Sequence, residues 1–253
     1  SFSGGVSIAA GNSQSGVGTT ISMKAGLSSQ STGGSLLFSS GSSATEQSGN
    51  FKLVSGEGEL ASGAVSVSSG ISASDNSGSI SLSSGTATKN SGTVTISAGQ
   101  AETGVGGNIG VDAGSSTVST GGSIQITSGA GLASTSGAVS VATAQSGAAG
   151  SSGQISLATG SAKLASGEIK IQSGNSQTSA GDILLSVGSS QEQGGSIVMQ
   201  AGNSATATGG SLALSSGSGL PSGGVTIQSA QAGTSGSSGA INIASGVADA
   251  GSS

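Results

Sequence analysis

The sequence of 253 residues contains no cysteine, histidine, tryptophan or tyrosine. Without cysteine the chain can form neither disulfides nor thiolate zinc sites. Without histidine it cannot build a Ser-His-Asp triad or a Cys-His pair. Its many serines have no base to activate them, and an unactivated hydroxyl is a poor nucleophile. The sequence therefore predicts a protein that is not an enzyme and that has no catalytic residues.

Charge is also scarce. Charged residues make up 6% of the chain, with five basic and ten acidic residues and a net charge of −5. Nucleic-acid binding needs a basic surface that displaces counterions from phosphates, so that class of function is excluded. No run of 18 apolar residues could span a bilayer, and we expect no membrane-spanning segment.

The few carboxylates predict neither a metal nor a cofactor site. Glu57 and Glu59 lie close together, but in a variable segment that we expect to form an exposed turn. Calcium-binding repeat proteins carry an aspartate at a fixed place in each repeat. The aspartates of this chain occupy unrelated places: Asp75, Asp112, Asp182 and Asp249. We expect no metal and no cofactor.

What the chain does contain is glycine, at 50 positions, and a regular pattern of apolar residues. Glycine- and serine-rich chains are often flexible linkers. Linkers, however, have no reason to space valine and isoleucine periodically. The period therefore favours an ordered repeat protein over a disordered one.

Each repeat contains a pair of apolar residues two positions apart, as in Val94 and Ile96. There are seventeen such pairs, spaced mostly by 14 or 15 residues. The first members are Val6, Ile21, Leu36, Phe51, Val65, Ile80, Val94, Ile109, Ile124, Val139, Ile155, Ile169, Ile183, Ile197, Leu212, Val225 and Ile241. A spacing of two is the period of an extended strand, so both members of each pair share one side, which we expect to point inward into a thin core. Helices are not expected.

Small residues follow every pair at fixed places. In the repeat of Val94, these are Ala98, Gly99 and Ala101. The glycine recurs in fifteen repeats, with Ala144 and Ala230 as the exceptions. The position of Ala101 is always serine, alanine or glycine, which predicts that backbone lies close to it. A second glycine precedes each pair, except that Gly18 comes one residue early.

Together these features predict an all-β fold: a narrow, flattened, parallel β-solenoid of about 17 coils with 14–15 residues per coil. Coils of two repeats are the alternative. The solenoid would be one continuous domain over residues 1–253, and the variable segments with Pro221 would form its outer corners. The motif begins at Ser3 and closes at Gly246 with no cap at either end. We therefore expect end-to-end polymerisation or a longer repeat chain.

Coil length and a small, Ser/Thr-rich composition resemble the ice-binding solenoids of insects and grasses. Those proteins carry a regular outward row, often Thr-X-Thr. The corresponding row here is interrupted by Leu37, Lys52, Lys170 and Leu184. Ice binding is therefore the alternative function, which a measurement of thermal hysteresis would decide.

The repeat itself has the form Ser-Gly-Gly-Ser-Ile-X-Ile-X-Ser-Gly. In this it resembles the long Ser/Gly-rich repeat proteins of microbial and algal cell surfaces, and the resemblance spans all seventeen repeats. It implies a structural filament subunit, surface appendage or adhesin stalk, located outside the cell or on its surface. The partner it implies is the protein itself, associated end to end or laterally.

Overall fold

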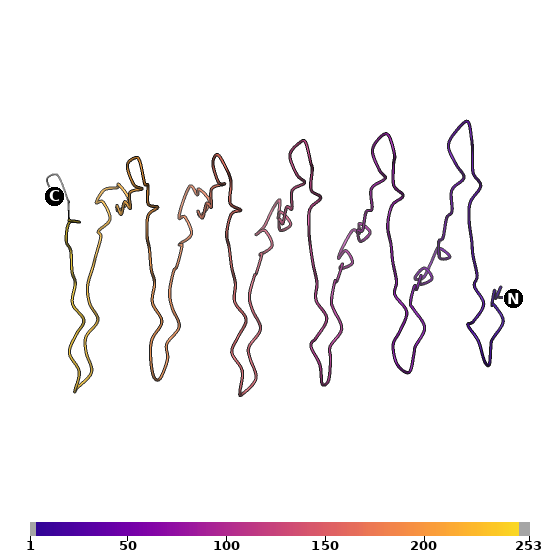
Figure 1. Ribbon diagram of the computed structural model, residues 1–253, viewed down its shortest axis with the longest axis horizontal. Helices are drawn as coiled ribbons and strands as arrows, with labels where there is room; N and C mark the ends of the chain where they lie inside the picture. The colour runs from indigo at the N-terminus through magenta and orange to yellow at the C-terminus, as the bar shows by residue number, and fades with distance from the viewer. Residues whose placement is uncertain (1–3, 248–253) are drawn as a thin grey trace. The chain divides into compact units, whose positions relative to one another are not determined.

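The chain of the protein is irregular and rich in coil. The structure, a computed structural model, describes residues 4–247, and over these residues it contains no helix and no β-strand. Nearly straight stretches of chain alternate with reversals (Figure 1). Two compact units divide the chain, Ser1–Ile126 and Thr127–Ser253, and both contain the same repeated features.

Each repeat consists of an extended segment and a corner. The extended segment begins two residues before the apolar pair and ends two residues after it, as in residues 92–98. The corner is the stretch up to the next extended segment, as in residues 99–106. One bend or turn lies in each of the sixteen corners: at 14–16, 29–31, 44–46, 59–60, 73–75, 88–89, 102–104, 117–119, 132–134, 148–149, 163–164, 177–178, 191–192, 205–207, 220–221 and 234–235.

Every bend or turn of the described residues falls within one of the variable segments, but these segments are not the outer corners of a solenoid, because residues 4–247 contain no β-strand. Pro221 belongs to the bend at 220–221, where its missing N–H costs no hydrogen bond of an extended segment. The variable segments of the sequence are therefore the places where the described chain bends.

The predicted β-solenoid is wrong, whether its coils hold one repeat or two. A solenoid requires backbone hydrogen bonds between stacked coils. Residues 4–247 form nine backbone–backbone hydrogen bonds, and none joins residues more than eight apart. A folded domain forms about one hydrogen bond per residue. The described chain therefore has no ladder between its extended segments.

The expected thin core is absent as well. No residue between 4 and 247 is buried. The accessible surface is 25132 Å² for a chain of 22.9 kDa. A folded monomer of this mass exposes about 9,600 Å², and an unfolded chain about 33,000 Å². The single chain thus keeps most of its surface in water.

The alternation of apolar and polar residues explains why the sequence predicted a solenoid that the structure does not contain. It specifies that Val94 and Ile96 share one side of an extended backbone, but it does not specify what lies against that side. Ordering a chain with 50 glycines also costs more entropy than ordering an average one. Local pattern therefore did not determine how the segments pair.

The positions that the sequence restricts to small residues are the most covered ones. Eight residues of the described chain are partly covered, and all of them lie four or seven places after the first member of a pair. They are Ala10, Ala25, Ser28, Ser55, Ser128, Ser146, Ala201 and Ala232. The chain packs most closely where its corners begin.

Candidate functional site

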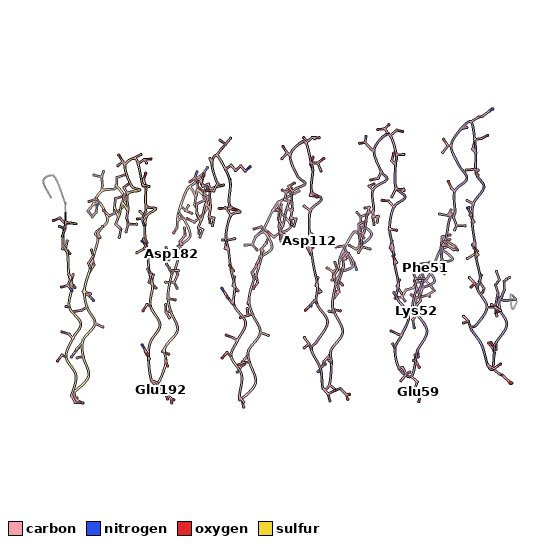
Figure 2. All side chains as sticks on the ribbon, in the orientation of Figure 1. Phe51, Lys52, Glu59, Asp112, Asp182 and Glu192 are labelled. Carbon is pink, nitrogen blue, oxygen red and sulfur yellow. The ribbon has the colours of Figure 1, made fainter. Side chains whose placement is uncertain are left out.

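The apolar pairs are the most regular chemical feature of the chain, and they are uncovered. Val94 is 50% exposed and Ile96 is 71% exposed. Of the aromatic pair members, Phe38 is 54% exposed and Phe51 is 65% exposed; Figure 2 labels Phe51. An exposed aliphatic side chain gains about 1.5–3 kcal/mol when it becomes fully buried. Seventeen repeated pairs therefore make a large surface suited to association.

A hydrogen bond closes the base of many corners. The N–H of Gly107, which opens one extended segment, donates to the carbonyl of Gly99, which follows the previous one, at 3.0 Å. Six corners share this eight-residue closure. Their donors are Gly34, Gly49, Gly107, Gly122, Gly137 and Gly210. In these six corners, the glycine that follows one pair thus meets the glycine that precedes the next pair.

The repeat with the displaced glycine keeps this closure by another route. Gly18 lies one residue early, so that Thr19 occupies the usual position of the glycine. The hydroxyl of Thr19 donates to the carbonyl of Gly11 at 2.8 Å. A side-chain donor therefore replaces the backbone donor where the pattern departs.

Close approach at the corner base explains several of the glycines that open the extended segments, whereas others, such as Gly92, have only ordinary contacts. A Cβ on Gly107 would lie 3.0 Å from Cβ of Ala98, and one on Gly195 would lie 2.8 Å from Cγ1 of Val187. Both distances are too short for ordinary contact. No glycine in the described residues has a positive φ. Space, and not backbone conformation, therefore demands glycine at Gly107 and Gly195.

A serine hydroxyl holds many corners in shape. The Oγ of Ser116, seven places after the first pair member Ile109, accepts the N–H of Ser119 at 2.9 Å. Eight corners contain such a bond from the same position of the repeat. The acceptors are Ser13, Ser28, Ser43, Ser72, Ser116, Ser176, Ser190 and Ser204. The serine offers the local side-chain acceptor that favours turns.

Where glycine occupies the position seven places after the first pair member, the corner is tighter. A Cβ on Gly58 would collide with the carbonyl of Ala61, and one on Gly131 would collide with the carbonyl of Thr135. In these repeats the backbone does lie close, as the sequence predicted. In the serine repeats, the additional reason for a small residue is the hydrogen bond, which sequence reasoning missed. The preference for serine over alanine at this position was the available signal.

The two repeats without glycine after the pair have longer corners with turns of their own. Ala144 and Ala230 begin these corners. Gly150 donates to the carbonyl of Gly147, and Gly236 donates to that of Gly233, each at 3.2 Å. The longer corner reverses through this inner turn. The missing glycine is therefore tied to a different way of closing the corner.

Charged side chains are spread along the described chain without forming a site. Glu59 and Glu192 lie in corner bends, whereas Asp112 and Asp182 lie on extended segments (Figure 2). No group of three potential metal ligands occurs within residues 4–247. Asp249, which the sequence also singled out, lies outside the described residues.

The described residues also enclose no pocket. Within the same range, no helix long and apolar enough to cross a bilayer is present. Comparison with family models, with curated proteins and with solved structures found no match. The repeated apolar pair, held between glycine-closed corners, is thus the feature on which a function can be argued.

Proposed function

We propose that this protein is an extracellular structural protein, a filament subunit or surface stalk, that works by self-association and not by catalysis. The observation that carries the proposal is the exposure of the apolar pairs, such as Val94 and Ile96, in all seventeen repeats. Exposed apolar surface of this extent favours association in water.

The residue types of the chain support a structural role over an enzymatic one. The chain has no histidine or cysteine, so its serines have no imidazole or thiolate beside them that could take part in catalysis. The hydroxyl of Ser116, for example, is used to hold a corner. The resemblance to cell-surface repeat proteins supports a location outside the cell or on its surface.

Repetition supports association through many weak contacts. A chain with many equivalent sites gains avidity once the first site is engaged, since further contacts form at high effective concentration. One pair such as Ile80 and Leu82 would hold two molecules weakly. Seventeen pairs would hold them firmly, as a fibre or stalk requires.

Sedimentation of the purified chain over a range of concentrations tests this proposal, together with electron microscopy of the same samples. We expect particles that grow with concentration and fibres in the images. A single species of one chain at every concentration, with no fibres, would overturn the proposed function.

A further inference from the structure

The two sides of the extended segments differ in the residues that they hold. Residues two apart share a side of an extended backbone, so Gly92, Val94, Ile96 and Ala98 form one side, called here the pair face. The opposite side holds the residues between them. In every repeat the pair face has the order glycine, apolar, apolar, small, with Thr19 and Val187 as the departures.

No charged residue occupies a pair face in any of the seventeen repeats. The charges of the extended segments all lie on the opposite side, three basic and three acidic. They are Lys24, Lys52, Lys170, Asp112, Glu168 and Asp182. The extended segments are therefore neutral in sum, and their pair faces contain no group that would be costly to remove from water.

The corners have a different balance. Six acidic residues and two lysines lie in the corners of the described chain. The acidic residues are Glu46, Glu57, Glu59, Asp75, Glu102 and Glu192, and the lysines are Lys89 and Lys163. Corners of two copies would repel each other at short range, whereas extended segments would not. Copies can therefore approach most closely through their extended segments.

We infer that the pair face binds the pair face of a second copy of this chain. This inference rests on the proposed self-association and names the surface that performs it. When two uncharged faces meet, no charge is removed from water, whereas a charged partner would lose the hydration of its charges. The glycine and the small residue at the ends of each face also leave room for the bulky pair of a partner. Because an identical copy has the same spacing between its seventeen pair faces, two copies can align all of these faces in one register.

The available area is sufficient for this binding. The chain exposes 25132 Å², which exceeds the surface of a folded monomer of its mass by about 15,500 Å². A specific interface buries about 1,200–2,000 Å² in total. A small part of the excess surface would therefore be enough for a stable contact between copies.

The test places equal charge on the two sides of the same three segments in the full chain. The pair-face variant is Val67→Glu, Leu82→Glu and Ile96→Glu, whose wild-type side chains are 70%, 74% and 71% exposed. The control variant changes the preceding residues of the opposite side. It is Ser66→Glu, Ser81→Glu and Thr95→Glu. Both variants add three negative charges, so net charge does not distinguish them.

Sedimentation gives the concentration at which half of the chains are assembled. Like charges brought together at an interface cost several kcal/mol, so the pair-face variant should raise this concentration by about a hundredfold or more. The control variant should raise it by less than about threefold, because its charges stay in water. Wild type and control should both show particle size that depends on protein concentration.

The outcomes separate this inference from the proposed function. Assembly of the pair-face variant at the wild-type concentration would overturn the pair face as the contact, while self-association would stand. Equal loss of assembly in the pair-face variant and the control variant would also overturn the pair face as the contact. If the wild-type chain did not assemble at all, the proposed function and the pair-face contact would both fail.

Discussion

The corners and the extended segments of this chain differ in what stabilises them. Corners have internal partners: Gly107 donates to Gly99 across a corner base, and Ser116 accepts the N–H of Ser119 within the next corner. Beyond the residue that opens them, extended segments have no hydrogen-bond partners within residues 4–247, and their apolar pairs are exposed. Local hydrogen bonds therefore accompany the bends of the chain, whereas the segments between the bends would find partners only through the self-association proposed above.

Removing apolar residues from one region at a time is the strongest test of this difference between corners and extended segments. One variant changes extended segments, with Leu53→Ser, Ile80→Ser and Val94→Ser. The other removes the same residue types from corners, with Leu60→Ser, Ile71→Ser and Val105→Ser. In the single chain the corner residues are the more exposed, at 93% or above, against 63%, 60% and 50% for the segment residues.

We expect the segment variant to have the larger effect on assembly. Loss of three half-exposed side chains should cost about 1 kcal/mol each and raise the assembly concentration measured by sedimentation by about a hundredfold. The corner variant should shift it by less than about threefold. If total exposed apolar area controlled assembly, the corner variant would show the larger shift, and the distinction between the regions would fail.

A second prediction concerns the close approach of the chain at the corner base. Gly107→Ala introduces a Cβ about 3.0 Å from Cβ of Ala98 and 3.4 Å from N of Gly99. The bond from residue 107 to Gly99 should weaken by about 1 kcal/mol, so that amide exchange at residue 107, followed by NMR, should become about fivefold faster.

Gly92→Ala is the matched control for this substitution. The nearest atom to its added Cβ is Cβ of Ser84 at 3.6 Å, an ordinary contact. Both substitutions reduce the freedom of the unfolded chain equally. Amide exchange at residue 107 should be unchanged in the control. Unchanged exchange in Gly107→Ala as well would show that close approach does not require glycine there.

The smallest expected effect concerns the serine of the corner. Ser116→Ala removes the acceptor of the Ser119 N–H, and amide exchange at residue 119 should accelerate about twofold to threefold, because water replaces an exposed hydrogen bond at little cost. Repeats with alanine at this position, such as Ala87 and Ala101, exist in the same chain. Ser115→Ala is the control and should leave residue 119 unchanged. Equal acceleration in both variants would argue against the serine bond.

Corners were the part of the fold that the sequence could predict. Glycine, serine and proline act through local geometry, so the variable segments and the crowding around Ala98 and Gly107 could be inferred from residue types alone. The β-solenoid could not be inferred correctly, because pairing between segments depends on which distant backbone lies alongside. The alternation at Val94 and Ile96 describes one segment and does not specify which other segment lies beside it.

The candidate site was foreseen in part. The apolar pairs were identified from their spacing, but they were expected to face inward, and they are exposed. The charge-free character of the pair face could be read from the sequence, since Lys52 and Lys170 both lie between the members of a pair. The bond from Ser116 to Ser119 could not be foreseen from composition, because serine serves equally as a small residue and as an acceptor.

Hydrogen exchange in single chains tests the central claim most directly. Samples dilute enough to sediment as one chain would be compared by mass spectrometry with assembled samples. For extended segments such as residues 92–98, the account predicts exchange at nearly the unprotected rate in single chains and slower exchange after assembly. Protection of these segments by more than about a hundredfold in single chains would contradict it, since the segments would then have partners within one molecule.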